Sequence, residues 1–241
     1  MENINDSHSL IINYPIDYEL FPLANNEKIY TIELNKNEYL LIPKFWFHWV
    51  YTEPNTVSVS YNIPFINCNL LEENIFYKSF KYSSPYKGIS NKSNINYNDF
   101  INSSLGYKYR AIISETSDCS PVIKNNLKKY FYSNTLADII SKTKNDYVYI
   151  GNSIIYEGNL LNQFSHITTI IDKKYYHGIY FKTNCWFTLD KVINSGLHHD
   201  DTDNIIYVLD GKKTIYLFHP KSGNNIYKQN FSRINSYDTY Y

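Results

Sequence analysis

The stretch that decides the fold is SGLHHDDTDNIIYVLDGKKTIYLFHP, residues 195–220. Its second half holds two short runs, Ile205–Asp210 and Lys213–His219, that are rich in Ile, Tyr, Val and Leu. Aromatic and β-branched residues favour strands, and two such runs joined through Gly211-Lys212 are typical of a β-hairpin. We therefore expect the polar segment 195–204 to lead into a β-hairpin of a mainly β fold.

The rest of the chain indicates strands, then helices, then strands again. Residues 28–63 contain four runs of strand-forming residues separated by turn formers, KIYTIEL, EYLLIP, WFHWVYT and TVSVSYNI. Asp118-Cys-Ser-Pro is typical of a helix start, so we predict helices over about 121–131 and 135–143. Strand signals return after Asp146, in DYVYIG, SIIYEG, ITTIID, YYHGIYFKT and CWFTL. We expect one α+β domain over 1–241, with portions 1–63, 64–145 (mixed or helical) and 146–241.

The composition is that of a globular protein with balanced charge. Lys plus Arg and Asp plus Glu both number 23, and 43% of the residues are hydrophobic. Nucleic-acid binders usually carry a basic excess, so a protein partner is favoured over RNA, and DNA is not expected. Cys68, Cys119 and Cys185 form no disulfide pattern. Without an apolar run of about 18 residues or a leader-like start, we expect a cytoplasmic protein with no membrane partner.

The polar segment before the hairpin contains His198-His199-Asp200. In an extended chain, His198 and Asp200 point to the same face. Together they could supply two positions of a metal octahedron, and one more His would complete a two-His, one-carboxylate triad. His199 is the alternative first ligand, but it does not share a face with Asp200. The alternative interpretation is a polar turn between strands.

Lys213 stands at the start of the second run of the hairpin. A lysine that projects into a barrel beside a metal is unfavourable unless it meets an anion. A dicarboxylate that chelates the metal at one end would provide such an anion. The alternative is an exposed lysine of the hairpin.

The segment EYLLIPKFWFHWV, residues 38–50, resembles the JmjC and cupin-8 oxygenases, in which an apolar strand ends in Ile-Pro and Trp-x-His carries an iron ligand. Residues 195–220 are similar to that family's first metal strand and the hairpin after it. The two matches cover about 28–61 and 176–238. The resemblance implies a double-stranded β-helix (cupin or jelly-roll) core that uses Fe(II), with 2-oxoglutarate as co-substrate.

Roles in the family carry over to this chain residue by residue. The resemblance implies that His198, Asp200 and His48 are the iron ligands. It also implies that Lys213 binds the far carboxylate of 2-oxoglutarate with help from Ser195, and that Asn204 lies near the other carboxylate. The chain departs from the family at Ser60, where some members carry Asn, and at His219-Pro220, where Pro-Pro is usual.

The order of the two motifs is reversed, because Trp46-Phe-His48 precedes the His198-x-Asp200 motif here. Joined end to start, the chain would follow the family's order. We therefore expect a circularly permuted domain, which is feasible because domain termini often lie close together. The alternative is two half-domains that complete their sites only between chains, and the oligomeric state stays open.

These features favour an Fe(II)- and 2-oxoglutarate-dependent dioxygenase. Hydroxylation of a protein side chain is the leading expectation, ahead of demethylation and RNA-base hydroxylation. One alternative is a cupin-like binding or structural protein that keeps the ligands without turnover. Another is a cupin that uses a different divalent metal for isomerase or lyase chemistry.

Overall fold

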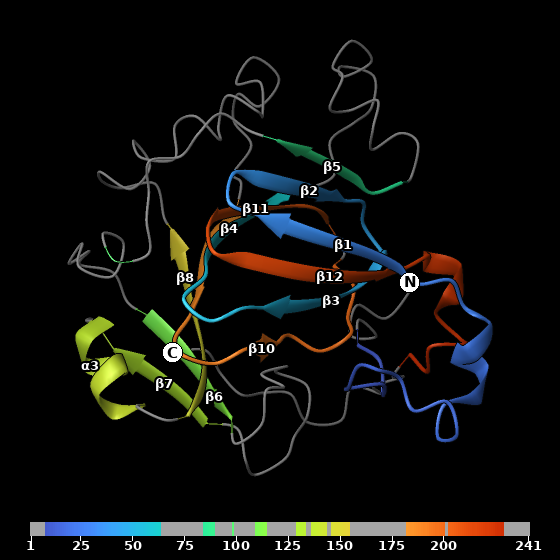
Figure 1. The fold of residues 1–241 in the computed structure, drawn as a ribbon, viewed down its shortest axis with the longest axis horizontal. Coiled ribbons are helices and arrows are strands. Elements are labelled where there is room, and N and C mark those ends of the chain that lie inside the picture. The colour runs from blue at the N-terminus through green and yellow to red at the C-terminus, as the bar shows by residue number, and fades with distance from the viewer. Residues whose placement is uncertain are drawn as a thin grey trace.

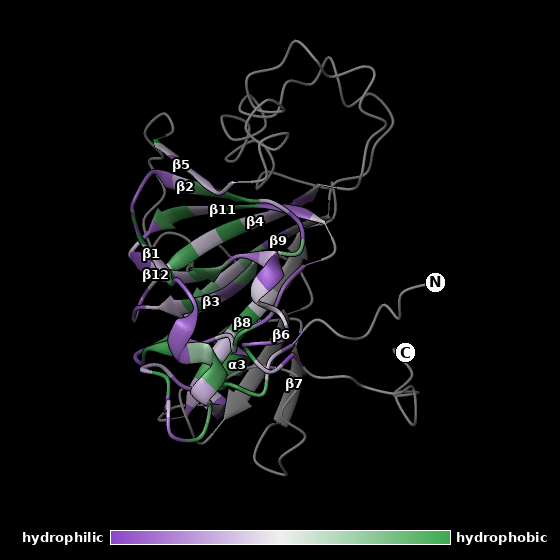
Figure 2. Cartoon of the chain, turned by 90° about the vertical axis from the view of Figure 1, so that its right-hand side faces the viewer, coloured by the Kyte–Doolittle hydropathy of each residue, from purple (hydrophilic) through white to green (hydrophobic). Residues whose placement is uncertain are grey.

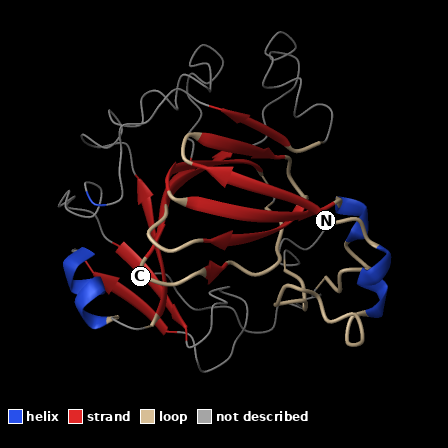
Figure 3. Cartoon of the chain, in the orientation of Figure 1, coloured by secondary structure: helices blue, strands red, loops and turns tan. Residues whose placement is uncertain are grey.

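A computed structural model describes residues 8–63, 84–89, 98, 109–114, 129–133, 136–143, 146–154, 182–200 and 202–228. Most of these residues form antiparallel strands, and helices lie at the periphery (Figure 3). Within these ranges no helix is long and apolar enough to cross a membrane. The single cysteine among them, Cys185, is buried and free.

Two sheets make up the core (Figure 1). The smaller sheet has the order β1 (Tyr30–Asn35), β12 (Lys212–Phe218), β3 (Phe47–Thr52) and β10 (Ile193–Asn194). The larger sheet has the order β5 (Tyr86–Ile89), β2 (Glu38–Ile42), β11 (Asp203–Asp210), β4 (Val57–Ile63), β9 (Lys182–Thr188), β8 (Tyr147–Ile154), β6 (Tyr109–Ser114) and β7 (Lys129–Ser133). All of the strand pairs are antiparallel. The jelly-roll core expected from the sequence is confirmed.

Alternating apolar residues of both sheets form the interior. Side chains on a strand point to opposite faces in turn, and the inward positions pack into one buried cluster: Leu34, Leu40, Ile42, Trp46, Val50, Ile206, Val208, Ile215 and Leu217. Hydrophobic residues also run along β11 in Figure 2. Since each buried aliphatic side chain contributes about 1.5–3 kcal/mol, this cluster holds the sheets together.

The N-terminal segment covers part of the outer face of the smaller sheet. Ile11 and Ile16 pack with Phe47, Trp49 and Phe218 in a second buried cluster. The segment continues into the 3-10 helix η1 (Pro22–Asn26), which begins with a proline in its first turn. A second short 3-10 helix, η4 (Pro220–Ser222), follows β12. The outer face is therefore buried around Phe47, Trp49 and Phe218, whereas Thr31 and Glu33 of β1 are exposed.

The two ends of the described chain lie side by side. The Leu10 N–H donates to the Tyr227 carbonyl at 3.0 Å, and Ser9 forms a β-bridge with Lys228. Residues near the start of the chain are thus hydrogen-bonded to residues near its end.

The predicted hairpin is wrong in its pairing, although both of its strands exist. β11 pairs with β2 and β4, whereas β12 pairs with β1 and β3. Gly211 therefore connects the two sheets instead of two neighbouring strands. The physical reason is burial, because Ile206 of β11 and Ile215 of β12 face one interior from opposite sheets.

The predicted helix over 121–131 is also wrong at its end, because residues 129–131 belong to β7, where Phe131 pairs with Ala111 of β6. The aromatic residues there favour a strand; residues 121–128 lie outside the described chain. The second helix is confirmed as α3 (Leu136–Lys142). DYVYIG and the start of SIIYEG form one strand, β8. ITTIID and most of YYHGIYFKT lie outside the described residues.

The crossover from β11 to β12 depends on Gly211, whose φ is +86°. A Cβ at this position would lie 2.3 Å from Oγ1 of Thr56. That hydroxyl accepts from the Lys212 N–H at 3.1 Å and donates to the Lys212 carbonyl at 3.2 Å. The threonine cannot move away without breaking both hydrogen bonds.

We expect Gly211→Ala to lower the free energy of unfolding by about 2 kcal/mol or more, through the positive φ and the clash with Thr56. Gly223→Ala is the matched control, because Gly223 has helical angles and a Cβ there would keep 3.6 Å from its nearest neighbour. The control should change stability by less than about 0.5 kcal/mol. Denaturant unfolding measures both variants, and equal effects would contradict this account.

Candidate metal centre

His48 and His198 are brought together by their own backbones. The His48 N–H donates to the His198 carbonyl at 2.7 Å, and the His198 N–H donates to the His48 carbonyl at 3.1 Å. This antiparallel bridge fixes the segment before β11 against β3. As a consequence, the two imidazole rings lie next to each other, with their centroids 4.3 Å apart.

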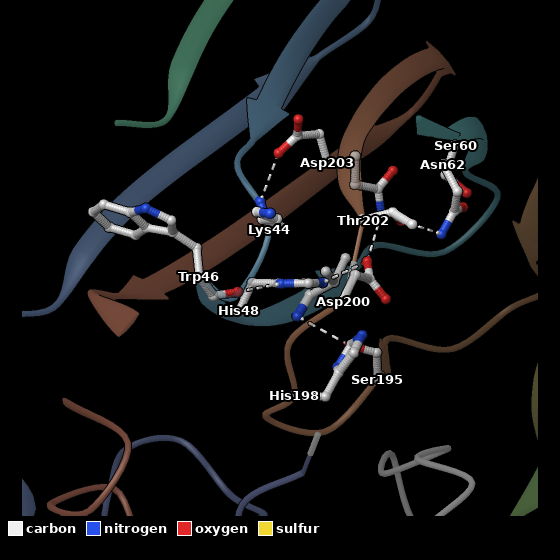
Figure 4. A network of polar contacts seen from close by, with 12 residues as sticks. Lys44, Trp46, His48, Ser60, Asn62, Ser195, His198, Asp200, Thr202 and Asp203 are labelled. Carbon is white, nitrogen blue, oxygen red and sulfur yellow. Dashed lines mark hydrogen bonds and ion pairs between the residues drawn. The ribbon is translucent and has the colours of Figure 1, made fainter. Parts of the chain in front are cut away.

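Asp200 completes a cluster of three ligand-type side chains (Figure 4). Its Oδ2 lies 3.7 Å from Nε2 of His48, and the ligand atoms of His48, His198 and Asp200 all lie within 4.8 Å of one another. All three come from one chain, so the alternative of sites completed only between chains is not needed.

His199 points away from this cluster. Its ring lies between those of Phe45 and Phe47, at centroid distances of 5.7 Å and 4.8 Å. Because successive side chains of an extended segment alternate in direction, His198 and Asp200 share the face toward His48. The structure therefore places His199, the alternative ligand, among apolar rings.

Backbone carbonyls fix the tautomers of both imidazoles in the cluster. Nδ1 of His48 lies 3.0 Å from the Trp46 carbonyl, and Nδ1 of His198 lies 2.9 Å from the Gly196 carbonyl. A carbonyl only accepts, so each Nδ1 carries a proton, and Nε2 is the nitrogen that presents a lone pair in the neutral ring. Hydrogen bonds of this kind orient metal-binding histidines in proteins.

The charges suit a divalent cation. Burial, helped by the neighbouring His198, lowers the pKa of His48 to about 4. Burial alone would raise the pKa of Asp200, but His48, His198 and a hydrogen bond from Asn204 outweigh it and lower that pKa. At neutral pH the cluster thus offers the neutral imidazole of His48 and the carboxylate of Asp200, the forms that bind metals.

The donor set fits a first-row divalent metal. Ions of this size lie about 2.1 Å from nitrogen and oxygen ligands, so one ion can bridge the 3.7 Å between His48 and Asp200. Two imidazoles and one carboxylate on one side of an ion leave positions for further ligands, as in non-haem iron sites. In addition, the buried Oδ1 of Asn204 has no hydrogen-bond partner within the described part of the chain.

Lys213 lies in the same interior. It pairs with Thr52 of β3, and His48 is four positions before Thr52, so Lys213 and His48 share one face of the smaller sheet. Its side chain is buried, and Nζ donates to the Tyr149 hydroxyl at 3.3 Å. Burial lowers the pKa of Lys213 to about 7. The alternative of an exposed hairpin lysine is therefore wrong.

Tyr149, which contacts the Lys213 ammonium, is a residue that the sequence analysis did not identify. It comes from β8, and its ring stacks on Trp186 of β9 at a centroid distance of 5.0 Å. The Trp186 indole N–H donates to the Ser60 hydroxyl at 2.8 Å. The chain contains 26 tyrosines, and only the pairing of β8 with β9 selects this one.

The two remaining predicted residues, Ser195 and Asn204, lie beside the metal cluster. The Ser195 hydroxyl accepts from the Val50 N–H and donates to the Gly196 carbonyl, each at 3.2 Å. It therefore braces the loop before His198, while Tyr149 is the hydroxyl that contacts Lys213. Nδ2 of Asn204 donates to Oδ2 of Asp200 at 2.7 Å and so orients that carboxylate.

Comparisons with known proteins agree with this architecture. The cupin-like domain family (Cupin-8) matches residues 2–66 and 91–239. A JmjC domain-containing protein of Acanthamoeba polyphaga mimivirus is 28% identical over 228 residues, 85% of this chain and 36% of that protein. JmjC domain-containing protein C of Dictyostelium discoideum is 41% identical over 58 residues, 24% of this chain and 14% of that protein. The chain thus spans about a third or less of these relatives, and no solved structure matches it.

We expect Lys213→Met to stabilise the metal-free chain by about 1–4 kcal/mol at or below neutral pH, because an apolar side chain replaces a buried cation. The unfolded lysine titrates near 10.4 and the folded one near 7. Between these values the unfolded chain binds more protons, so the stability of the wild type should rise with pH there. The variant should lose this rise, as denaturant unfolding at pH 6 to 10 would reveal.

Lys212→Met is the matched control. Lys212 is partly exposed and pairs with Glu33 at 2.9 Å. Its removal should change stability by less than about 1 kcal/mol. A destabilised Lys213→Met variant would indicate that the protein alone satisfies the Lys213 ammonium.

Proposed function

We propose that this chain, which belongs to the cupin-like domain family, is an Fe(II)- and 2-oxoglutarate-dependent oxygenase. The observation that carries the proposal is the burial of the Lys213 ammonium in the interior that also holds His48. Buried lysines are rarely kept without an anion. A dicarboxylate that reaches from the metal cluster to Lys213 would supply one.

Each group of the site receives a role in this proposal. His48, His198 and Asp200 would hold the iron, with the two carbonyl-bonded imidazoles and the Asn204-bonded carboxylate already oriented. When bound, Fe(II) with 2-oxoglutarate supplies the activation of O₂ and the oxidation of a C–H bond. The chain's part is to orient these ligands and to exclude water from the apolar interior.

Lys213 and Tyr149 would bind the far carboxylate of 2-oxoglutarate. A charge-assisted hydrogen bond from Lys213 and a neutral one from Tyr149 would converge on it. Lys213 would be protonated when the co-substrate is bound despite its lowered pKa, because a nearby anion favours the charged form of a lysine. Asn204, whose Nδ2 amide group donates to Asp200, would lie near the other carboxylate.

A protein side chain is the substrate class that we propose. The balanced charge of the chain favours it over RNA, since RNA binding normally draws on a basic surface. Hydroxylation is the reaction proposed first, and demethylation of a methylated side chain would begin with the same oxidation.

We also propose that the domain is circularly permuted. The backbone pairing of Ser9 and Leu10 with Lys228 and Tyr227 supports this order, because a short connection could join these two ends in relatives. The cut would then fall beside the metal cluster instead of within the core.

Release of succinate from 2-oxoglutarate, measured with Fe(II) and O₂ but without a substrate, tests the activity. We expect slow turnover by the wild type and none by His198→Ala or Asp200→Ala, both of which should also lose bound iron. His199→Phe is the control, because His199 lies among phenylalanine rings outside the cluster. A wild type that binds iron and forms no succinate would instead indicate a binding protein.

Lys213→Met tests the co-substrate role. Loss of a charge-assisted hydrogen bond worth roughly 1.5–3 kcal/mol should weaken the apparent affinity for 2-oxoglutarate about tenfold or more and spare iron affinity. Lys212→Met should leave both affinities unchanged. Isothermal titration under anaerobic conditions measures them, and an unaltered 2-oxoglutarate affinity in Lys213→Met would contradict the assignment.

A further inference from the structure

We infer that His8 is a positioning residue of the metal centre, which holds the plane of the His198 imidazole by stacking on it. The inference rests on the proposed metal site and adds a residue to it. His8 forms a β-bridge with His198, and the two rings stack with their centroids 5.4 Å apart and their planes inclined by 19°.

His198 is the ligand that needs such support. His48 is 2% exposed, so the surrounding protein fixes its ring, whereas His198 is only half-buried. The hydrogen bond from Nδ1 to the Gly196 carbonyl holds one edge of the His198 ring. The torsion that turns a histidine ring has broad minima, so a hydrogen bond at one edge does not by itself fix the plane of the ring. A second ring stacked on its face restricts that rotation.

The backbone around His8 is anchored independently of its ring. The Ser9 N–H donates to the Leu197 carbonyl at 2.9 Å, and the buried Ser9 hydroxyl donates to the Ile226 carbonyl and accepts from the Ile11 N–H. Ser9 therefore connects the segment before His198 to residues near the other end of the described chain. These hydrogen bonds fix the position of the His8 ring. A ring that is fixed in this way can restrict the rotation of the His198 ring.

His8 stands outside the set of ligands. Among the described residues, the metal-type cluster contains His48, His198 and Asp200, and His8 is not part of it. Stacking places the face of the His8 ring against His198, while ligation would require one of its ring nitrogens to point at the metal. A flat aromatic ring without nitrogen should therefore serve in its place, whereas a small or non-planar side chain should not.

Binding of Co²⁺, followed by its visible absorption bands, tests this inference without enzyme activity. We expect His8→Ala and His8→Leu to weaken Co²⁺ affinity about tenfold or more, the range found for groups that orient metal ligands. His8→Phe should stay within about threefold of the wild type and keep its Co²⁺ spectrum. If His8→Ala fails to fold, the comparison of Leu with Phe still decides, since both fill the space and only Phe stacks.

Tyr14→Ala is the matched control. Tyr14 belongs to the same N-terminal segment and also stacks on a ring, that of Tyr216 at 4.0 Å. Its loss should leave Co²⁺ affinity unchanged, whereas a loss equal to that of His8→Ala would assign the effect to the segment as a whole and overturn the inference.

Three other results would also overturn it. Unchanged affinity in His8→Ala and His8→Leu would remove the positioning role and leave the proposed function intact. A loss in His8→Phe equal to that in His8→Ala, with an altered Co²⁺ spectrum, would make His8 a ligand. A wild type that binds no Co²⁺ or Fe²⁺ would remove the proposed metal function, and this inference with it.

Discussion

The reciprocal hydrogen bonds between the backbones of His48 and His198 are the constraint on which the rest of the site depends. They join segments that are far apart in the sequence, and antiparallel pairing brings opposite side chains close together. Once this bridge forms, alternation along the chain brings Asp200 to the same face and sends His199 into the apolar rings of Phe45 and Phe47. The ligand geometry is thus a consequence of backbone pairing and needs no separate packing arrangement.

The second constraint is the electrostatic one imposed by Lys213. Its cross-strand partners are Leu34 and Thr52, and the Tyr149–Trp186 stack lies at its ammonium. These groups solvate an ammonium poorly. A tyrosine hydroxyl offers one neutral hydrogen bond, less than water provides, and the lowered pKa reflects this deficit. A buried ammonium that lowers the stability of the protein is better explained by a ligand that binds it than by a contribution to folding. The cluster of His48, His198 and Asp200, which combines two imidazoles with one carboxylate, is suited to a metal ion as well.

The sequence predicted which residues of the candidate site come together better than it predicted their surroundings. His198-x-Asp200 and Trp46-Phe-His48 are local patterns whose residue types the ligation chemistry dictates, and alternation is enough to choose His198 over His199. The pairing of β11 and β12 was predicted wrongly because a Gly-Lys turn signals a reversal of the chain and does not say which sheet the next strand enters. A helix was expected up to residue 131, but residues 129–131 belong to β7. A few apolar residues at short spacing fit the period of a helix and that of a strand equally well. Tyr149 and His8 reach the site only through tertiary pairing, so no local signal marks either of them.

The position of the N-terminal segment connects the fold to the chemistry. Residues 8–11 lie between the loop that carries His198 and the segment 226–228, with hydrogen bonds to both. A segment held from two sides loses most of its freedom when the chain folds, and its side chains become dependable neighbours for the site. If the domain is permuted as proposed, the cut lies next to residues 8–10 and 226–228, which hydrogen bonds hold side by side. The start of the chain can then contribute a ring to the metal centre, because its place is set by the strands beside it and not by what precedes it.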